Sequence, residues 1–565
     1  MAGDDFRQDP PRLGNTYDDD PALRGLLRRL IPDDVRGPLE AEWRALGAEA
    51  AGPLLELARA AEAQPPRHVP FDAWGRRTDA VETCPAWQAL QDAAARLGLY
   101  AVPYEGALGP HARLHQGALL ALYAPSSAIA SCPLAMTDGA ARTLLEHDPA
   151  LAARVVPRFT TRDPRALWTC GQWMTETSGG SDVGGTRTVA RPDADGGYRL
   201  WGSKWFTSAV TSQAALTLAR VEGAPEGSAP LSLFFLELRD AAGSLNGIRV
   251  ERLKDKLGTR ALPTAELTLL GARAVAVGGP GQGVRKITPL LNTTRLHNAV
   301  NACSTIGRLL QLLRDYARRR MAFGGALSAK PLHRETLASL QVEYEAALGL
   351  TFECLRLLGR LEAGQATPRD RLCLRVLTPV AKLASARQAV AAASEALEGF
   401  GGAGYVEDTG LPVWLRNAQV LSIWEGTTNV LSLDVLRAGV REGALDAWAD
   451  DTRARLTALD PGPLAASASA LAAHLEHAAT WFRAAGGAGD EALEAGGRRF
   501  AMAVAAISSG LALCEQGAWA LAQGLGERTA LAARRWTAEK LRPLPDLGSA
   551  AAEARARAVL GLAEE

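Results

Sequence analysis

The sequence predicts a mainly α protein with a central antiparallel β domain between two helical regions. Apolar residues recur at three- and four-residue spacing from about residue 21 to 159 and again after residue 283, as on amphipathic helices. Between these regions, short alternating, β-branched or aromatic runs are separated by turns rich in Gly, Pro and Asp. A chain of 565 residues exceeds the size at which one hydrophobic core stops growing, so several domains are expected.

The elements are expected in the following order along the chain. Residues up to about 20 carry Asp runs with Pro and Gly and should form an extended arm. Strands are expected at residues 197–206, 214–221, 231–238, 248–253 and 265–270. A long helix is expected at residues 378–397, with Pro379 early and Gly399 after its end. The predicted domains are an N-terminal arm and helical domain, a β domain, a helical bundle and a C-terminal helical extension, at residues 1–165, 166–285, 286–442 and 443–565.

Composition excludes several classes of protein. Lys plus Arg and Asp plus Glu both total 62, so no global field favours nucleic acid or an anionic membrane, and polyanion binding would need a local patch. No stretch approaches the roughly 20 apolar residues of a membrane span, and the charged N-terminus is unlike a secretory signal. The seven cysteines lack CxxC spacing and should be reduced thiols, which favours the cytoplasm. No His or Cys stands at metal-ligand spacing, so no metal is assigned.

Two segments of the β region can contact a flat or anionic ligand. Residues 174–183 read Met-Thr-Glu-Thr-Ser-Gly-Gly-Ser-Asp-Val, and their small residues let backbone amides approach a ligand. Residues 204–208 read Lys-Trp-Phe-Thr-Ser and close the first expected hairpin, where a Trp can pack on a flat ring while a hydroxyl bonds its edge. The alternatives are a polar surface turn and a hairpin aromatic in the core, and each alternative is favoured when its segment is considered alone.

Two further segments belong to the second helical region. Arg320 and Phe323 follow a helix and suit a pyrophosphate and an adenine, although three consecutive arginines can also be a solvated helix end. Residues 399–404 contain a GxGxxG pattern, but a helix precedes it, so a Rossmann site is rejected in favour of a helix C-cap and a loop. Glu425 stands in the sequence Ile-Trp-Glu-Gly-Thr-Thr-Asn at residues 423–429. The alternative for Glu425 is a helix-start carboxylate favoured by the helix dipole.

These segments, in this order and on this helix–β–helix plan, resemble the acyl-CoA dehydrogenase family, and within it the AidB-like alkylation-response branch. The resemblance covers nearly the whole chain. It rests also on Phe-Asp-Ala-Trp-Gly-Arg-Arg at residues 71–77, Pro-Ala-Trp at 85–87, Ser-Cys-Pro-Leu-Ala-Met-Thr at 131–137, Leu-Lys-Asp-Lys-Leu-Gly at 253–258 and Leu-Asp-Val-Leu-Arg at 433–437. It implies bound FAD and a homotetramer in which each FAD spans a subunit interface.

The resemblance also implies roles for single residues. Within one subunit, Met174 and Thr175 are expected near the flavin's pyrimidine side, Ser181 at the pyrophosphate, Trp205 beside the isoalloxazine and Thr207 near its N5. Gly180 is also expected to contact FAD. A neighbouring subunit's FAD would be held by Arg320, Phe323, Gly401 and Gly402. Thr427 and Asn429 would touch the ribityl or adenine portion. Arg295 would lie near the substrate and Glu425. Two positions depart from the family: Glu398 replaces a common Gln, and Asn292 replaces an Asp that binds CoA in shorter-chain relatives.

The implied activity is oxidation of an acyl-CoA. Glu425 would remove the α-proton as the β-hydride passes to flavin N5, and Trp424 would desolvate the carboxylate and raise its pKa. The main-chain amide of Glu425 would polarise the thioester carbonyl. A short or branched acyl-CoA is the expected substrate, and an electron-transfer flavoprotein is the expected acceptor.

The AidB-like branch implies a second possibility, a flavoprotein that protects double-stranded DNA from alkylation and has vestigial dehydrogenase activity. Such binding needs a basic surface and weakens steeply with salt. The extension offers the basic candidates Arg453, Arg455, Arg498, Arg499, Arg528, Arg534, Arg535, Lys540, Arg542, Arg555 and Arg557, but a similar number of acidic residues accompanies them. An extension that serves packing and oligomerisation is the alternative.

Overall fold

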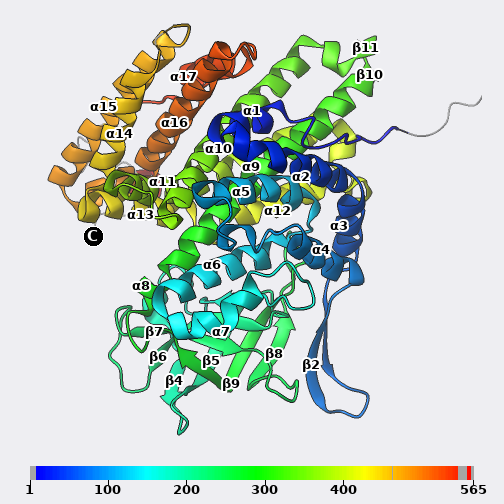
Figure 1. Ribbon diagram of the computed structural model, residues 1–565, viewed down its shortest axis with the longest axis vertical. Coiled ribbons are helices and arrows are strands. Elements are labelled where there is room, and N and C mark those ends of the chain that lie inside the picture. The colour runs from blue at the N-terminus through cyan, green and yellow to red at the C-terminus, as the bar shows by residue number, and fades with distance from the viewer. Residues whose placement is uncertain (1–7, 461, 545–556, 562–565) are drawn as a thin grey trace, which may run out of the picture. The chain divides into compact units, whose positions relative to one another are not determined.

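The structure is a computed structural model that describes residues 8–460, 462–544 and 557–561. Arg555, one of the basic candidates, lies outside these residues. Two compact units are present (Figure 1). Unit 1 comprises Met1–Arg44, Gly109–Ala118 and Asn298–Glu565, and unit 2 comprises Ala45–Leu108 and Leu119–His297. The division passes through α2 (Asp33–Ala51), α5 (Ala112–Tyr123) and α9 (Thr288–Arg319). The four predicted domains stay a prediction.

Unit 2 contains the predicted β domain as one seven-stranded sheet. Its strands are β3 (Cys170–Trp173), β4 (Val189–Pro192), β5 (Tyr198–Ser208), β6 (Ala214–Val221), β7 (Leu231–Glu237), β8 (Ile248–Leu253) and β9 (Thr264–Ala276). All five predicted strands are present, and most pairings are antiparallel. The two four-residue strands β3 and β4 were missed, and both pair parallel to β6. Residues 174–188 connect them, so the first candidate segment is a loop held at both ends by the same strand.

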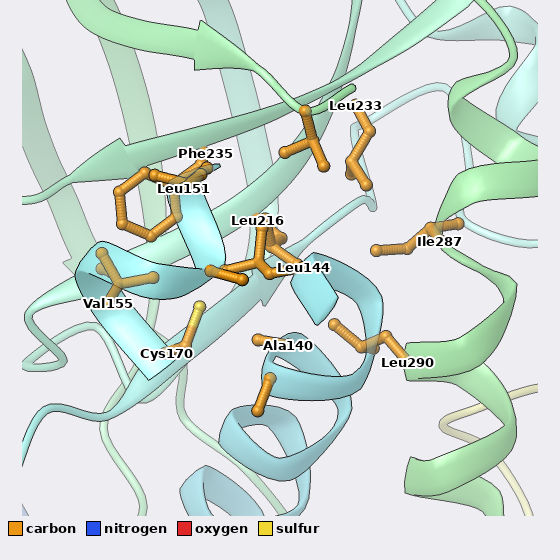
Figure 2. Close-up of a cluster of buried hydrophobic side chains, with 14 of the residues drawn as sticks. Ala140, Leu144, Leu151, Val155, Cys170, Leu216, Leu233, Phe235, Ile287 and Leu290 are labelled. Carbon is orange, nitrogen blue, oxygen red and sulfur yellow. The ribbon is translucent and has the colours of Figure 1, made fainter. Parts of the chain in front are cut away.

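Helices cover one face of this sheet. Figure 2 shows Leu144 of α6 (Ser131–His147) and Val155 of α7 (Pro149–Phe159) packed in one cluster with Leu216 and Phe235 of the sheet. Each fully buried aliphatic or aromatic side chain of this kind contributes roughly 1.5–3 kcal/mol. The remaining helices of unit 2 are α3 (Pro53–Ala63), α4 (Pro85–Arg96) and α8 (Gly283–Lys286), with 3₁₀ turns at Val102–Tyr104, Ala124–Ser126 and Val183–Gly185.

A β-hairpin interrupts the N-terminal region that the periodicity predicted to be helical. It consists of β1 (Arg67–Phe71) and β2 (Arg77–Glu82), and the uniform helical prediction was wrong here. Buried Asp79 fixes the hairpin because its carboxylate accepts hydrogen bonds from Arg77 at 2.9 Å and from the amide of Val250 at 3.1 Å. Trp74, in the turn of the hairpin, is 93% exposed.

Unit 1 is helical, as predicted. Besides its parts of α2, α5 and α9, it contains α1 (Pro21–Leu30), α10 (Pro331–Glu362), α11 (Pro368–Gly399), α12 (Pro412–Leu421), α13 (Thr428–Glu442), α14 (Ala444–Ala458), α15 (Ala465–Ala488), α16 (Asp490–Ala522) and α17 (Arg528–Lys540). A short hairpin, β10 (Met321–Ala322) and β11 (Gly325–Ala326), follows α9. Turns of 3₁₀ helix lie at Gly109–His111, Leu327–Ala329, Gly401–Gly404 and Glu407–Thr409.

The long helix α11 begins earlier than predicted. A capping box formed by Thr367 and Asp370 starts it, and Pro368 occupies its first turn. Pro379 therefore lies inside the helix, so its predicted place near the start was wrong. It is buried there, where packing compensates for the backbone hydrogen bond that proline cannot donate.

Arg455 links two helices of the extension to each other and the extension to the rest of unit 1. Arg455 of α14 contacts Glu515 of α16 at 2.7 Å and Glu353 of α10 at 2.8 Å. Burial alone would raise the pKa of Glu353, but Arg455 and Arg356 hold it well below its usual range. Among the described helices, α16 alone is long and apolar enough to cross a membrane, and 78% of its apolar window is buried, as in the core helix of a soluble protein.

None of the seven cysteines forms a disulfide in the structure. Five are buried, and only Cys84 and Cys132 are partly exposed. No group of three His, Cys, Asp or Glu residues within the described ranges is arranged to hold a metal ion.

Candidate active site

The loop after β3 carries the first four candidate residues. Met174 is buried, Thr175 is half-buried, and Gly180 and Ser181 are exposed. A side chain at position 180 would lie 2.5 Å from the hydroxyl of Thr175, so glycine is required for this fold of the loop. The amide of Trp205 donates to the carbonyl of Thr175 at 2.9 Å. The structure therefore brings the first two predicted segments together.

A buried ion pair between Lys204 and Glu176 holds this loop. Lys204 is fully buried, and its Nζ donates to Glu176 at 2.8 Å and to the carbonyl of Leu218 at 2.9 Å. The carboxylate of Glu176 also accepts from the amide of Arg187 at 2.7 Å and from the hydroxyl of Thr188 at 2.6 Å. Each charge thus has the partners that a buried charge requires.

The pKa of Glu176 is lowered. Burial would raise it, but the charge of Lys204 and the hydrogen bonds to the carboxylate outweigh burial. Both residues belong to the two segments singled out in the sequence, but their pairing was not predicted. The alternation of β5 gave a usable signal. It places the charged Lys204 on the same face of the strand as the buried, apolar Leu200.

Trp205 and Thr207 project from β5. The Nζ of Lys254 lies 3.2 Å from the centroid of the Trp205 ring and donates to Glu266 at 2.7 Å. The ring is only half-buried, so part of it is accessible to a flat ligand. Thr207 is buried, and its hydroxyl donates to the carbonyl of Ala265 at 2.7 Å, which leaves only its oxygen as an acceptor. Its role near flavin N5 stays a prediction.

Arg295 and Asn292 also lie in unit 2, on one face of α9, and the guanidinium of Arg295 donates to the amide oxygen of Asn292 at 3.3 Å. One turn along the helix, His297 is buried and lies 2.7 Å from the carboxylate of Asp138. The hydroxyl of Tyr104 donates to the same carboxylate at 2.6 Å. His297 is therefore a hydrogen-bonded core histidine.

Glu425 lies in unit 1 in the turn between α12 and α13. Its φ is +57°, in the left-handed region that a residue with a side chain rarely adopts, and Gly426 follows with φ +101°. A side chain at position 426 would also lie 3.0 Å from Leu431. Thr427 ends the turn as the N-cap of α13, where its hydroxyl accepts from the amide of Val430 at 3.4 Å. Asn429, in the first turn of α13, is exposed.

Two buried polar side chains hold this turn, and the sequence reasoning missed both. Lys382 of α11 has no exposed surface, and its Nζ donates to the carbonyl of Gly426 at 2.6 Å. Asn298 of α9 accepts from the indole of Trp424 and donates to the carbonyl of Leu421 at 3.2 Å. A signal for Lys382 was its charge within an otherwise apolar stretch of a helix, since lysine is rarely buried without a partner.

The remaining candidates are open to solvent. Phe323, in the turn between β10 and β11, is 94% exposed and adopts a φ of +50°. The guanidinium of neighbouring Arg320 forms no ion pair with a residue in the described ranges. Gly401 and Gly402 are exposed, and added side chains there would meet nothing within 4 Å.

These residues fit the parts of FAD predicted for them. An exposed aromatic ring next to an uncompensated arginine suits an adenosine and its diphosphate. Small, exposed residues at 180 and 181 beside a half-buried Trp205 suit the approach of a heteroaromatic ring and a phosphate.

Comparison with protein-family profiles assigns nearly the whole chain. Residues 8–164 match the adaptive response protein AidB N-terminal domain, and residues 171–271 match the acyl-CoA dehydrogenase middle domain. Residues 281–440 match the acyl-CoA dehydrogenase C-terminal domain, and residues 443–558 match the acyl-CoA dehydrogenase 11 C-terminal domain-like family.

Two curated relatives cover most of the chain. Acyl-CoA dehydrogenase family member 11 of Caenorhabditis elegans is 48% identical over 442 residues, which are 76% of this chain and 72% of that protein. Putative acyl-CoA dehydrogenase AidB of Escherichia coli is 35% identical over 392 residues, which are 68% of this chain and 71% of that protein.

Solved structures show the same fold. C. elegans ACDH-11 in complex with C11-CoA superimposes with a TM-score of 0.96 at 40% identity and covers 99% of this chain and 97% of its own. An acyl-CoA dehydrogenase of Bacillus anthracis complexed with FAD has a TM-score of 0.72 at 17% identity, covers 91% of this chain and 87% of its own, and supports the fold alone. The profiles and the curated relatives lead to one conclusion: this chain belongs to the acyl-CoA dehydrogenase family of FAD-dependent oxidoreductases.

Proposed function

We propose that this protein oxidises an acyl-CoA at its α and β carbons and that Glu425 is the base. The observation that carries the proposal is the left-handed backbone of Glu425, which is followed by a glycine that no other residue can replace without strain. Strained backbone persists where the surrounding structure enforces it, and it concentrates at functional sites. Here the hydrogen bond from Lys382 to the carbonyl of Gly426 and the N-cap Thr427 hold the residues that directly follow Glu425.

The chain's own residues perform the acid–base part of the reaction. The Glu425 carboxylate accepts the proton that leaves the α carbon, and a main-chain amide at the turn donates to the thioester carbonyl as negative charge develops there. A double bond forms between the α and β carbons. FAD, when bound, supplies the oxidant that takes up the second hydrogen and the two electrons. Arg295 would assist at the substrate.

The acyl group remains the finer part of the proposal. The sequence led us to expect a short or branched acyl-CoA, whereas the relative at 40% identity was solved with C11-CoA. That complex supports a chain of medium length, and we propose this class in preference to the short one. A series of saturated acyl-CoA thioesters tests the choice, since the preferred length should give the highest kcat/KM.

The decisive experiment is Glu425→Gln. The variant should keep its FAD absorbance, but acyl-CoA should no longer bleach the flavin without oxygen, and turnover should fall by roughly 10²–10⁴-fold. Glu407→Gln is the matched control, because Glu407 is an exposed carboxylate of the same unit that pairs with Arg416. Retained turnover by Glu425→Gln would remove Glu425 as the base. Failure of every acyl-CoA to bleach the unaltered protein would remove the proposed reaction.

Three further parts of the proposal are based on the family to which the chain belongs. An electron-transfer flavoprotein is the proposed acceptor, and reduction of such a protein by substrate-reduced enzyme tests this. A cytoplasmic homotetramer is the proposed state, and the mass in solution tests its size. The exposed Phe323 and Arg320 support a shared FAD site because, among the described residues, neither side chain has an ion pair or ring contact that would account for it.

Protection of DNA is not favoured by the contacts of the extension. Arg453, Arg455, Arg528, Arg535 and Lys540 each form an ion pair with a carboxylate, which reduces their capacity to neutralise phosphates. We therefore expect duplex DNA to bind only in the non-specific range, with Kd no tighter than about 10⁻⁶ M at physiological salt. Tighter binding in a salt titration would restore DNA binding as a function.

A further inference from the structure

A cavity of about 1110 Å³ lies among α10, α11, α16, α17 and the segment that follows α17, entirely within unit 1. None of its lining residues belongs to the turn at 423–429 or to the other predicted FAD contacts. Its volume is slightly above the roughly 300–1,000 Å³ of typical small-molecule sites, so a small organic molecule has room there.

Four arginines in the wall of the cavity are uncompensated. They are Arg387 on α11, Arg498 and Arg499 on α16, and Arg542 after α17. All four are exposed, and none forms an ion pair with a residue that the structure describes. Burial and the positive charge of Arg498 both lower the pKa of Arg387, so these two guanidinium groups repel each other across the cavity.

The acidic residues of the wall do not cancel this charge. Glu343 is occupied by Lys540 at 2.6 Å and by the amide of Gln388 at 2.8 Å. Glu335 pairs with Arg535 of α17. Glu395 is the remaining carboxylate of the lining, set against four arginines. The cavity therefore presents an excess of positive charge that an anionic ligand would neutralise.

The lining also has an apolar floor, beside the polar Thr336, Ser339, Gln388 and Ser509. Leu340, Ala392, Met502, Trp536 and Leu544 contribute to it. The indole nitrogen of Trp536 already donates to the carbonyl of Ala506 at 2.8 Å, so the ring offers a ligand only its apolar surface. Arginines beside an apolar floor match a molecule that has an anionic end and a hydrocarbon body.

We propose that this cavity binds an amphipathic organic phosphate, with its phosphate on the arginines and its hydrocarbon portion on the apolar floor. The guanidinium group of arginine is planar and always charged, and one such group can donate to two oxygens of the same phosphate. A duplex nucleic acid would use the same charges but would leave the apolar floor without a partner. The inference does not depend on the proposed dehydrogenase activity, because no residue of the predicted active site contributes to it.

The test measures binding of decyl phosphate, below its micelle concentration, to the FAD-loaded full chain by titration calorimetry. Decyl phosphate should bind at least about a hundredfold more tightly than inorganic phosphate, because burial of methylene groups adds to the phosphate contacts. Arg498→Glu should weaken binding of decyl phosphate at least about tenfold, through loss of a charge-assisted contact. Ala391→Trp should fill part of the cavity floor on α11, where Ala391 is exposed. It should weaken the binding of decyl phosphate and leave the binding of inorganic phosphate unchanged.

The matched control is Arg483→Glu, which reverses an exposed arginine on α15 outside the cavity and should leave decyl phosphate binding unchanged. Equal affinities for decyl and inorganic phosphate would reduce the cavity to a simple anion site and overturn the proposal. Binding that survives both Arg498→Glu and Ala391→Trp would place the ligand elsewhere, for example in the acyl-CoA site. If a short DNA duplex displaced decyl phosphate, and Arg498→Glu abolished the binding of that duplex, these arginines would be assigned to nucleic acid instead.

Discussion

The ammonium group of Lys382 donates a 2.6 Å hydrogen bond to the carbonyl of Gly426, the residue directly after Glu425. Lys382 is fully buried in α11, so the interior of the protein supplies a donor to one peptide of the turn that contains Glu425. A hydrogen bond from a charged donor contributes roughly 1.5–3 kcal/mol, enough to stabilise a left-handed residue beside it.

Lys382→Met should lower turnover through misplacement of Glu425. We expect kcat to fall by about 10²-fold with KM changed little, because a shift of about 1 Å at a catalytic group costs that much. Steady-state kinetics with an acyl-CoA and an artificial electron acceptor measure both constants. Lys286→Met is the control, since Lys286 also donates to backbone carbonyls but lies in unit 2. If the role of Lys382 were purely structural, Lys382→Met would lower the melting temperature but leave kcat of the folded fraction unchanged.

The pair of Glu176 and Lys204 gives a prediction about pH. Because the pKa of Glu176 is lowered in the folded state, the group contributes stability above its ordinary pKa of 4.5, and this is lost as pH falls through the folded value. Glu176→Gln should cost roughly 3–5 kcal/mol at pH 7, since it leaves Lys204 buried without its countercharge.

The difference between Glu176→Gln and the unaltered protein should narrow at acid pH in thermal unfolding experiments. The double variant Glu176→Gln with Lys204→Met should recover part of the loss, because it removes both charges. An additive loss in the double variant would show that the two groups stabilise the loop independently.

Lys256 gives a second prediction about pH, in the alkaline range. Burial lowers its pKa from 10.5 to about 8, so the folded state binds fewer protons than the unfolded state between these values. Stability from this group should therefore rise as pH increases from about 8 to 10.5, by about 3 kcal/mol in total at roughly 1.4 kcal/mol per pKa unit. Lys256→Met should lose that rise, which thermal unfolding across the interval measures. A constant difference between variant and parent would contradict the lowered pKa.

Phe323 and Arg320 should act on FAD and not on folding. Both are exposed, so Phe323→Ala and Arg320→Ala should leave the melting temperature of the apoprotein unchanged. We expect FAD retention to weaken by about tenfold or more for each, as measured by the ratio of flavin to protein absorbance after dialysis. Trp74→Ala is the matched control, because Trp74 is 93% exposed at another hairpin. Equal retention in all three variants would remove this hairpin from the FAD site.

Periodicity was sufficient to predict the helical regions and five strands because these parts of the chain are long enough to show a repeat. It failed at β3 and β4, which have four residues each, and at the hairpin of β1 and β2, where alternation is weak. Parallel pairing of β3 and β4 with β6 depends on long-range contacts that local patterns do not encode.

The candidate site shows the same limit. Residues of the catalytic turn and the flavin loop could be named because each lies in a contiguous, unusual sequence. Lys382 and Asn298 could not, because they reach the turn from helices far away in the sequence. Their roles depend on the direction of a buried side chain, which only the folded backbone sets.

The burial of five of the seven cysteines has a practical consequence for chemical labelling. Desolvation raises the pKa of Cys303, Cys373 and Cys514 to about 12, so their thiols carry almost no thiolate at neutral pH and should resist alkylation while the protein is folded. A maleimide reagent should reach only Cys84 and Cys132 in the native protein. Fluorophores can thus be attached to unit 2, where both residues lie, without first removing the other thiols.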